Sequence, residues 1–216
     1  MDKPGNTPSA TPILLATGNG DKQRAFRSLL DGLPLIPITP AESGINASPL
    51  EDGNTHEAIA QQKAVEWSKA GSMLAIASDG GLVIPALGSA WESRHTRRFA
   101  GQAVDDPQRV DRLLELMEPF TGVDRNASWA EAVAIAHKGR ILVSWELLGA
   151  AGEIALARQP GSVPEFWAFT VWSFPQYGKT YDQLTPVERE TLNDHWTRLG
   201  HLVRRFFQSV FVPPLD

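Results

Sequence analysis

The chain has 216 residues, of which 42% are hydrophobic, and it contains no cysteine. At this length folding hides roughly 70% of the extended surface, so no stapling is needed. The lack of cysteine excludes disulfides and a thiolate nucleophile. The net charge of −5 argues against a general nucleic-acid-binding surface, which needs concentrated lysine and arginine. No apolar run approaches the roughly 20 residues of a membrane span, so we expect a cytoplasmic protein without nucleic-acid or membrane partners.

The first half of the chain alternates predicted strands and helices. Residues 1–12 are polar and rich in proline, glycine and serine, which predicts a flexible lead-in. We assign residues 13–216 to a single domain, because no repeat or break in composition divides them. Apolar spacing predicts strands or helices, in alternation, at residues 13–16, 21–30, 33–40, 55–70, 73–77 and 107–117.

The second half changes character. Residues 128–136 and 140–148 are two strand-like runs separated by a Lys138-Gly139 turn, which predicts a hairpin. Residues 166–174 also predict a strand. A cap at Thr185, followed by proline, predicts the start of one long terminal helix. This order of elements predicts an α/β fold with a mixed sheet flanked by helices.

The segment ATGNGDK is a candidate phosphate-binding turn between the first strand and helix. Its glycines let backbone N–H groups approach an anion, and the helix N-terminus adds positive potential. Thr17 and Asn19 would add hydrogen bonds, and Lys22 a mobile charge. From spacing alone, a tight turn with an Asn or Asp cap explains the segment equally well. The spacing is not that of a Walker loop.

Asp79, in the segment SDGG, is the second candidate. It follows the buried strand at 73–77, and ligands of open α/β sheets collect beyond the carboxyl ends of strands. A carboxylate there can hold Mg²⁺ or take a proton from water. For an isolated Asp-Gly-Gly, however, a hydrogen-bonded turn aspartate is the commoner explanation.

Two further segments have weaker signals. Lys179 is a candidate phosphate contact and His195 a candidate hydrogen-bond donor, although charged helix faces are usually only solvated. The aromatic run at 166–172 offers faces on which a base can stack. Alternating large residues in a strand more often form a core, which is the interpretation we favour.

Taken in order, these segments resemble the inosine/xanthosine triphosphate pyrophosphatase family. Residues 13–30 (ILLATGNGDKQRAFRSLL) resemble its ATGNxxKxxE element, and residues 51–64 (EDGNTHEAIAQQKA) its ExGxTFxENAxxKA helix. Residues 77–87 (ASDGGLVIPAL) are similar to its ADDSGL strand. Residues 97–101 (RRFAG) and 174–196 resemble its SAR[FY][AS]G element and its VPxxxGKT…SHR tail.

The resemblance implies a highly twisted sheet in two lobes around a central cleft, and usually a homodimer. It implies Mg²⁺-dependent hydrolysis of non-standard purine nucleoside triphosphates to monophosphate and pyrophosphate. It assigns metal binding and water activation to Asp79. The substrate contacts that it implies are Thr17, Asn19, Lys22, Arg98, Lys179 and His195.

The motifs also depart from the family pattern. Ala58 stands where the family has its metal-binding glutamate, and Glu57 lies one residue earlier, a shift of about 100° and about 1.5 Å on a helix. We expect Glu57 to join Asp79 at the metal if the first turn adjusts, since Mg²⁺ needs only one or two protein carboxylates besides phosphates. Phe169 replaces the base-reading aspartate, and Trp196 replaces the arginine of the tail.

Three functions are therefore open. The first is a divergent pyrophosphatase for non-standard purine nucleotides. The second is a catalytically silent homologue that binds nucleotides or only dimerises, which the missing carboxylates at Ala58 and Ser78 and the altered base pocket favour. The third is a pyrophosphatase for another modified nucleotide.

Overall fold

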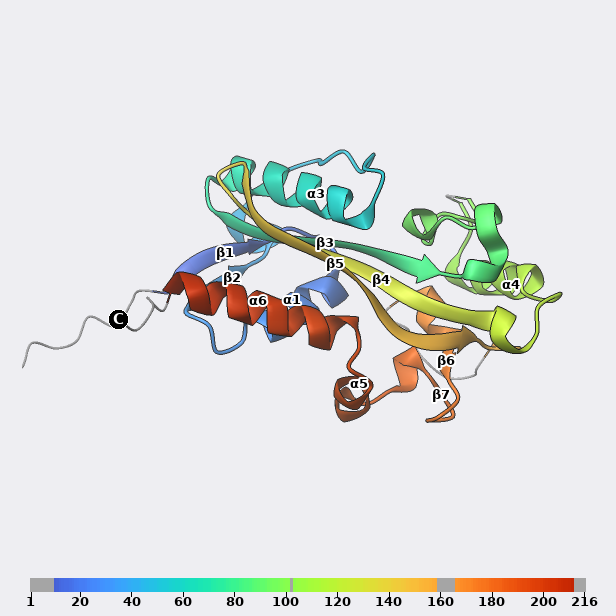
Figure 1. Ribbon diagram of the computed structural model, residues 1–216. Helices are drawn as coiled ribbons and strands as arrows, with labels where there is room; N and C mark the ends of the chain where they lie inside the picture. The colour runs from blue at the N-terminus through green and yellow to red at the C-terminus, as the bar shows by residue number, and fades with distance from the viewer. Residues whose placement is uncertain (1–9, 102, 159–165, 212–216) are drawn as a thin grey trace, which may run out of the picture.

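The computed structural model describes residues 10–101, 103–158 and 166–211. Its centre is a seven-stranded sheet in the order β2-β1-β3-β4-β5-β6-β7, which Figure 1 shows as a long twisted ribbon with helices on both faces. The parallel part pairs β1 (Thr11–Leu15) with the edge strand β2 (Leu35–Ile38) and with β3 (Leu74–Val83). The predicted α/β fold with a mixed sheet is confirmed.

The antiparallel part is built on the predicted hairpin. β4 (Asn126–His137) pairs with all of β3 on one side and with β5 (Arg140–Ile154) on the other. The short strands β6 (Trp172–Phe174) and β7 (Lys179–Thr180) complete the sheet. β4 is therefore the central strand of the sheet, with three strands on either side.

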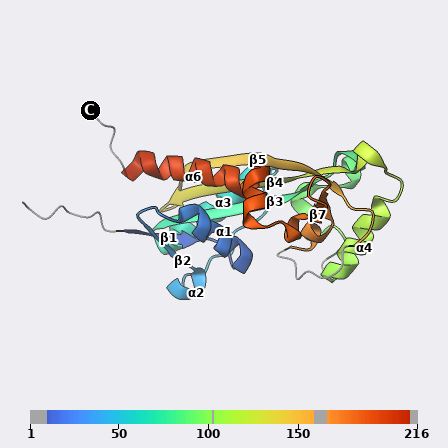
Figure 2. The same ribbon diagram turned by 90° about the horizontal axis from the view of Figure 1, so that it is seen from below.

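We call the end of the sheet that contains β1 and β2 the first lobe. Helices cover both of its faces, and the packing differs between the two faces. α3 (His56–Gly71) lies on one face, where its alanines meet a layer of alanines from β3 and β4. Such small side chains let a helix approach a sheet closely. α1 (Gly20–Leu30) and α6 (His195–Phe211) pack side by side on the other face, as Figure 2 shows. A short α2 (Pro40–Ser43) follows β2.

We call the opposite end of the sheet the second lobe. There α4 (Asp106–Leu116) and several 3₁₀ turns pack around the sheet. α5 (Pro186–Leu192) precedes α6. The core of this lobe is aromatic and includes Trp167, Trp172 and Tyr181, all fully buried. Among the residues that the structure describes, no helix is long and apolar enough to cross a membrane.

The structure corrects four details of the sequence prediction. β1 begins at Thr11, so the last two residues of the expected lead-in are in a strand; residues 1–9 lie outside the described part. β3 does not end in a turn at Asp79 but continues to Val83, because β4 pairs with it throughout. Residues Trp167–Thr170 form a 3₁₀ turn rather than a strand. The terminal helix is divided at Asn193, which adopts a left-handed conformation.

Candidate active site

A cleft opens where β1 ends and β3 continues. The pairing of β1 with β3 stops at Leu15 and Ile76, whereas β3 runs on along β4 to Val83. The turn between β1 and α1 lies beside this exposed stretch of β3. The result is a cleft of about 1080 Å³, and the expected site residues that line it are Thr17, Asn19, Lys22, Asp79 and Arg98. The candidate phosphate turn and the candidate carboxylate therefore face the same space.

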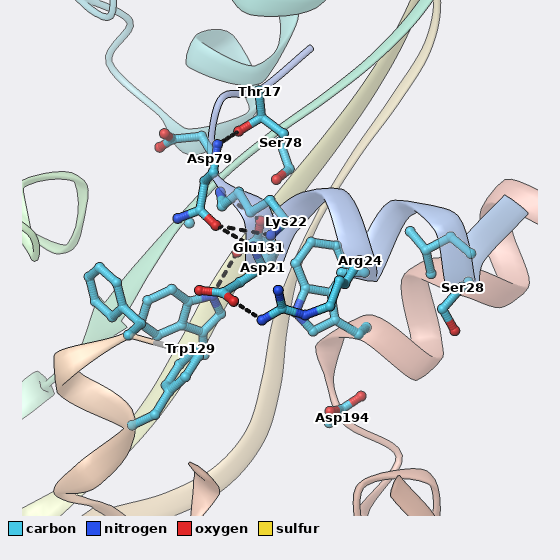
Figure 3. A pocket seen from close by; sticks show the side chains of 18 of the residues that line it. Thr17, Asp21, Lys22, Arg24, Ser28, Ser78, Asp79, Trp129, Glu131 and Asp194 are labelled. Carbon is cyan, nitrogen blue, oxygen red and sulfur yellow. Dashed lines mark hydrogen bonds and ion pairs between the residues drawn. The ribbon is translucent and has the colours of Figure 1, made fainter. Parts of the chain in front are cut away.

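The turn is held by its own side chains. Asn19 caps α1, because its Oδ1 accepts hydrogen bonds from the backbone N–H groups of Asp21 at 2.8 Å and Lys22 at 3.1 Å. Thr17 Oγ1 accepts from Asn19 N–H at 3.1 Å. Both side chains thus shape the turn, as a tight capped turn requires, and they aim the positive end of α1 into the cleft (Figure 3). The turn interpretation and the anion-site interpretation are compatible.

Asp79 is an ionised and firmly held carboxylate. Its Oδ2 lies 2.6 Å from His56 Nδ1, and its Oδ1 accepts from Lys63 Nζ at 2.9 Å. Burial alone would raise the pKa of Asp79, but the hydrogen bond from His56 and the charges of Lys63 and Lys22 outweigh it and lower the pKa below its usual value. Asp79 is therefore negatively charged at neutral pH.

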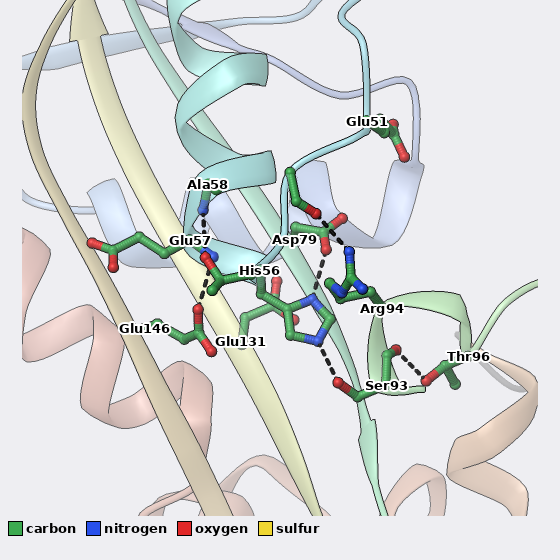
Figure 4. A network of polar contacts seen from close by, with 12 residues as sticks. Glu51, His56, Glu57, Ala58, Asp79, Ser93, Arg94, Thr96, Glu131 and Glu146 are labelled. Atoms are coloured by element: carbon green, nitrogen blue, oxygen red, sulfur yellow. Dashed lines mark hydrogen bonds and ion pairs between the residues drawn. The ribbon is translucent and has the colours of Figure 1, made fainter. Parts of the chain in front are cut away.

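His56 links Asp79 to the second lobe. Because an ionised carboxylate only accepts hydrogen bonds, His56 Nδ1 donates to Asp79, and its Nε2 lies 3.0 Å from Ser93 Oγ. Figure 4 shows this row of side chains from α3 across β3 to the segment after it. His56 is 2% exposed, so it positions the carboxylate from behind.

Lys63 joins a second carboxylate to the first. Its Nζ lies 2.9 Å from Asp79 Oδ1 and 3.1 Å from Glu51 Oε1. Burial would lower the pKa of Lys63, but the charges and hydrogen bonds of Asp79 and Glu51 raise it. Both carboxylates line the cleft, so hard oxygen ligands of the kind that Mg²⁺ prefers are within reach of one point.

The described residues do not by themselves form a complete metal site. Among the described residues there is no cluster of three or more His, Cys, Asp or Glu side chains that would hold an ion. The donors present fit Mg²⁺ only together with substrate phosphates, which is how this ion usually binds in nucleotide enzymes.

Arginines from the segment after β3 and from α4 also line the cleft, and we call this part of the lining the arginine wall. Arg94 donates to the carbonyl oxygen of Gly53 at 2.7 Å and pairs with Glu92. Its lining neighbours in this lobe include Arg97, Arg98 and Arg109. Guanidinium groups bind phosphate oxygens with two parallel hydrogen bonds, so this wall is suited to a polyphosphate.

Glu57 is directed away from the cleft. Its Oε1 accepts from Ser144 Oγ at 2.6 Å, and its backbone N–H donates to Glu146 Oε2 at 2.8 Å. Both partners are on β5, and Figure 4 shows the Glu57 side chain on the side opposite to Asp79. The 100° step from Ala58 is not compensated by the first turn of α3, so this conformation does not bring Glu57 to Asp79.

Lys179 and His195 are not among the residues that line the cleft, although His195 packs against two that are, Tyr181 and Trp129. Lys179 Nζ pairs with Glu188 at 2.6 and 2.9 Å. His195 is fully buried, and its ring stacks on Tyr181 at 5.5 Å between centroids. Burial lowers the pKa of His195, and neither of its ring nitrogens has a hydrogen-bond partner within the described part of the chain.

Lys179→Met is expected to leave KM for a triphosphate unchanged and to reduce stability near neutral pH. The hydrogen bond from Lys179 is the largest cause that lowers the pKa of Glu188 to about 2. The stabilisation is therefore complete above the usual pKa of a glutamate and is lost as pH falls toward 2. Urea unfolding at pH 7 and pH 3 should show a larger difference from the wild type at pH 7. A raised KM would instead support the contact that the family resemblance implies.

Sequence analysis missed several residues of this site. The motif that contains Lys63 was identified, but the ion pair of Lys63 with Asp79 was not predicted. His56 stands at a phenylalanine position of the same motif. Glu131 was the clearest missed signal, because it is the one charged residue in the run from Ala127 to Ala136, which is buried except at Ser128.

Comparison with known proteins agrees with this geometry. The family model that describes the Ham1 family matches residues 13–198. A dITP/XTP pyrophosphatase of Synechococcus sp. is 31% identical over 205 residues, which cover 94% of this chain and 89% of the relative. The protein of the same name from Desulfotalea psychrophila is 28% identical over 190 residues, covering 88% and 82%. The structure of a HAM1 protein from Coxiella burnetii matches with a TM-score of 0.76 at 26% identity, covering 90% of this chain and 99% of that one.

Proposed function

Because the chain belongs to the Ham1 family, we propose that it hydrolyses non-standard purine nucleoside triphosphates to the monophosphate and pyrophosphate. The similarity to proteins named dITP/XTP pyrophosphatase supports this substrate class. The observation that carries the proposal is the single cleft lined by both the capped turn before α1 and the ionised Asp79.

The polyphosphate binds between the turn and the arginine wall. Backbone N–H groups at the start of α1 and the ammonium of Lys22 hold it on one side, and Arg98 on the other. All of these groups line the cleft and carry hydrogen-bond donors or positive charge. Preorganised donors of this kind stabilise the negative charge that develops on the leaving pyrophosphate. Water then attacks the α-phosphorus in line, and the bond to the pyrophosphate oxygen breaks.

Asp79 acts by charge rather than as a strong base. A carboxylate with a lowered pKa is a poor proton acceptor at neutral pH, so its role is to orient the attacking water and to hold a cation. Mg²⁺, bound by Asp79 and Glu51 together with substrate phosphates, would supply further neutralisation of the polyphosphate charge. His56 and Lys63 keep the carboxylate in place.

Base selection relies on stacking at the aromatic end of the cleft. Trp129, Phe166 and Phe169 line that end, where Phe169 replaces a hydrogen-bonding aspartate of the family motif. Aromatic stacking contributes about 1–3 kcal/mol per base and tolerates different bases. In this conformation His195 offers no hydrogen bond to a base, because it is fully buried; a base contact by His195 remains a proposal from the resemblance.

A substrate panel tests the proposal directly. The purified protein, incubated with Mg²⁺ and separately with dITP, XTP, dATP and dGTP, is expected to release pyrophosphate faster from the first two. No pyrophosphate from any triphosphate at high enzyme concentration would overturn the proposal. Faster release of pyrophosphate from a different modified nucleotide would keep the proposed reaction but assign it another substrate.

A silent nucleotide-binding homologue is the second candidate. It is favoured by Ala58, which leaves no carboxylate at that point of α3, and by the fact that both oxygens of Asp79 already hold protein donors. This candidate predicts that triphosphates raise the melting temperature without being hydrolysed. Turnover that depends on Asp79 would reject it.

We also propose a homodimer in the cytoplasm, as the resemblance implies. Exposed apolar side chains on β5, among them Leu142 (48% exposed) and Leu148 (51%), support an interface on that strand. Light scattering after size-exclusion chromatography is expected to give twice the chain mass, and a monomer mass would contradict the dimer. Cell fractionation tests the location.

A further inference from the structure

Glu131 on β4 is a buried carboxylate that faces the cleft. Its side chain is 1% exposed, yet it belongs to the residues that line the cleft beside the start of α1. Apart from Ser128, its neighbours on β4 from Ala127 to Ala136 are apolar. A charge in such surroundings is costly unless it is paired and hydrogen-bonded, so its contacts should explain why it is there.

Both carboxylate oxygens of Glu131 are engaged. Oε1 accepts from Lys22 Nζ at 3.2 Å, and Oε2 accepts from Trp129 Nε1 at 2.7 Å. The indole fixes the carboxylate, and the carboxylate in turn fixes the end of the lysine. Figure 3 shows this chain of contacts running from Trp129 to Lys22 beneath the turn.

The strand next to Glu131 is shaped to admit it. Gly80 pairs with Glu131 across β3 and β4. A Cβ atom at position 80 would lie 1.9 Å from Glu131 Oε2 and 2.7 Å from the carbonyl oxygen of Ala130, so a larger residue would displace the carboxylate from its present position. Position 80 is the serine position of the family's ADDSGL motif, so glycine at 80 and the acid at 131 occur in this chain as a sterically matched pair.

We propose that Glu131 is a positioning residue that fixes the ammonium group of Lys22 for binding of the substrate polyphosphate. The proposal rests on the proposed function, because it takes the polyphosphate as the ligand of Lys22. A lysine ammonium has three N–H donors on a flexible four-carbon stem. One donor bound to Glu131 leaves two for phosphate oxygens, and the stem is ordered before the substrate arrives.

The charge of Glu131 separates positioning from simple attraction. Removal of a negative charge near the phosphate site should, by Coulomb's law, leave polyphosphate affinity equal or tighter. Loss of positioning should instead lower kcat. Glu131→Gln is nearly isosteric and keeps an oxygen to accept from Trp129, so it tests the charge pair with little change in packing.

The experiment compares Glu131→Gln, Lys22→Met and the double variant. We expect Glu131→Gln to lower kcat at saturating triphosphate by at least about fivefold, while the Kd for inorganic tripolyphosphate, measured by calorimetry, is unchanged or smaller. In the Lys22→Met background the same substitution should have no further effect, because the coupled partner is absent. Glu115→Gln, at an exposed position on α4, is the matched control and should equal the wild type.

A second measurement does not depend on turnover. Ammonium groups held in a salt bridge exchange slowly enough for their ¹H–¹⁵N signals to be recorded by NMR, and the signal absent from Lys22→Met identifies Lys22. We expect this signal to disappear in Glu131→Gln and to persist in Glu115→Gln. Persistence in Glu131→Gln, or additive kinetic effects in the double variant, would overturn the proposal. A wild type that hydrolyses no triphosphate but shows the Lys22–Glu131 coupling would overturn the proposed function instead.

Discussion

Asp79→Asn is expected to lower kcat for pyrophosphate release by about 100-fold or more, the usual effect of removing a preorganised charged group from an active site. Asn keeps an oxygen for the hydrogen bond from Lys63 but loses the negative charge that orients water and attracts a cation. Because His56 and Lys63 hold the wild-type carboxylate, their loss of an ionic partner should also cost about 1–2 kcal/mol of unfolding free energy.

Steady-state kinetics with the best substrate of the panel, together with urea unfolding, measure both effects. Asp111→Asn, which changes an exposed carboxylate on α4, is the matched control and should retain wild-type kcat. An Asp79→Asn protein that is folded and retains nearly full kcat would remove Asp79 from the mechanism. The other acids that line the cleft would then have to be considered, among them Glu51 and Glu131.

Most of the helices could be predicted from the sequence because their capping residues lie next to them in the chain. Thr55, Asp105 and Thr185 each cap a helix by accepting from the backbone N–H three residues on, and this is a signal that the sequence displays directly. The β4–β5 hairpin could also be predicted, because two strand-like runs flank a short turn that contains a glycine. In the structure Lys138 and Gly139 both take positive φ values in this turn.

Tertiary pairing determined what the sequence analysis missed. The Asp-Gly-Gly at 79–81 has the composition of a turn, but each of these residues pairs with a residue of β4, and this pairing keeps the segment extended. The terminal helix has a continuous apolar stripe, yet Asp194 starts a new helix by accepting from Thr197 N–H at 2.8 Å. Long-range partners of this kind are invisible to periodicity.

The site shows the same division. The turn from Thr17 to Lys22 and the carboxylate of Asp79 could be identified because each lies in a short motif. His56 and Glu131 could not be assigned roles, since their partners are 23 and 109 residues away in the chain. A lone acid in a buried strand is nonetheless a signal that a charged partner must exist.

Gly81→Ala is expected to destabilise the protein by about 4 kcal/mol, at the upper end of single substitutions. A Cβ atom at Gly81 would lie 1.9 Å from the carbonyl oxygen of Ser93 and 2.7 Å from its carbon. Backbone atoms cannot rotate away as a side chain would, so the turn at Ser93–His95 must move off β3. Gly18→Ala is the matched control, because a Cβ there meets nothing within 4 Å, and it should be neutral or slightly stabilising.

The displacement should also reach the active site. Ser93 Oγ contacts His56, and His56 holds Asp79, so a shift of Ser93 removes the support behind the carboxylate. Gly81→Ala should therefore lower kcat even at a temperature where the protein is folded. Gly18→Ala is the control for the change in stability only, which should be small. Urea unfolding and kinetics at 15 °C measure the two effects separately. If Gly81→Ala has the same unfolding free energy as the wild type, the contact between β3 and the Ser93 turn is not rigid. That result would also contradict the role of Ser93 in holding His56 and Asp79.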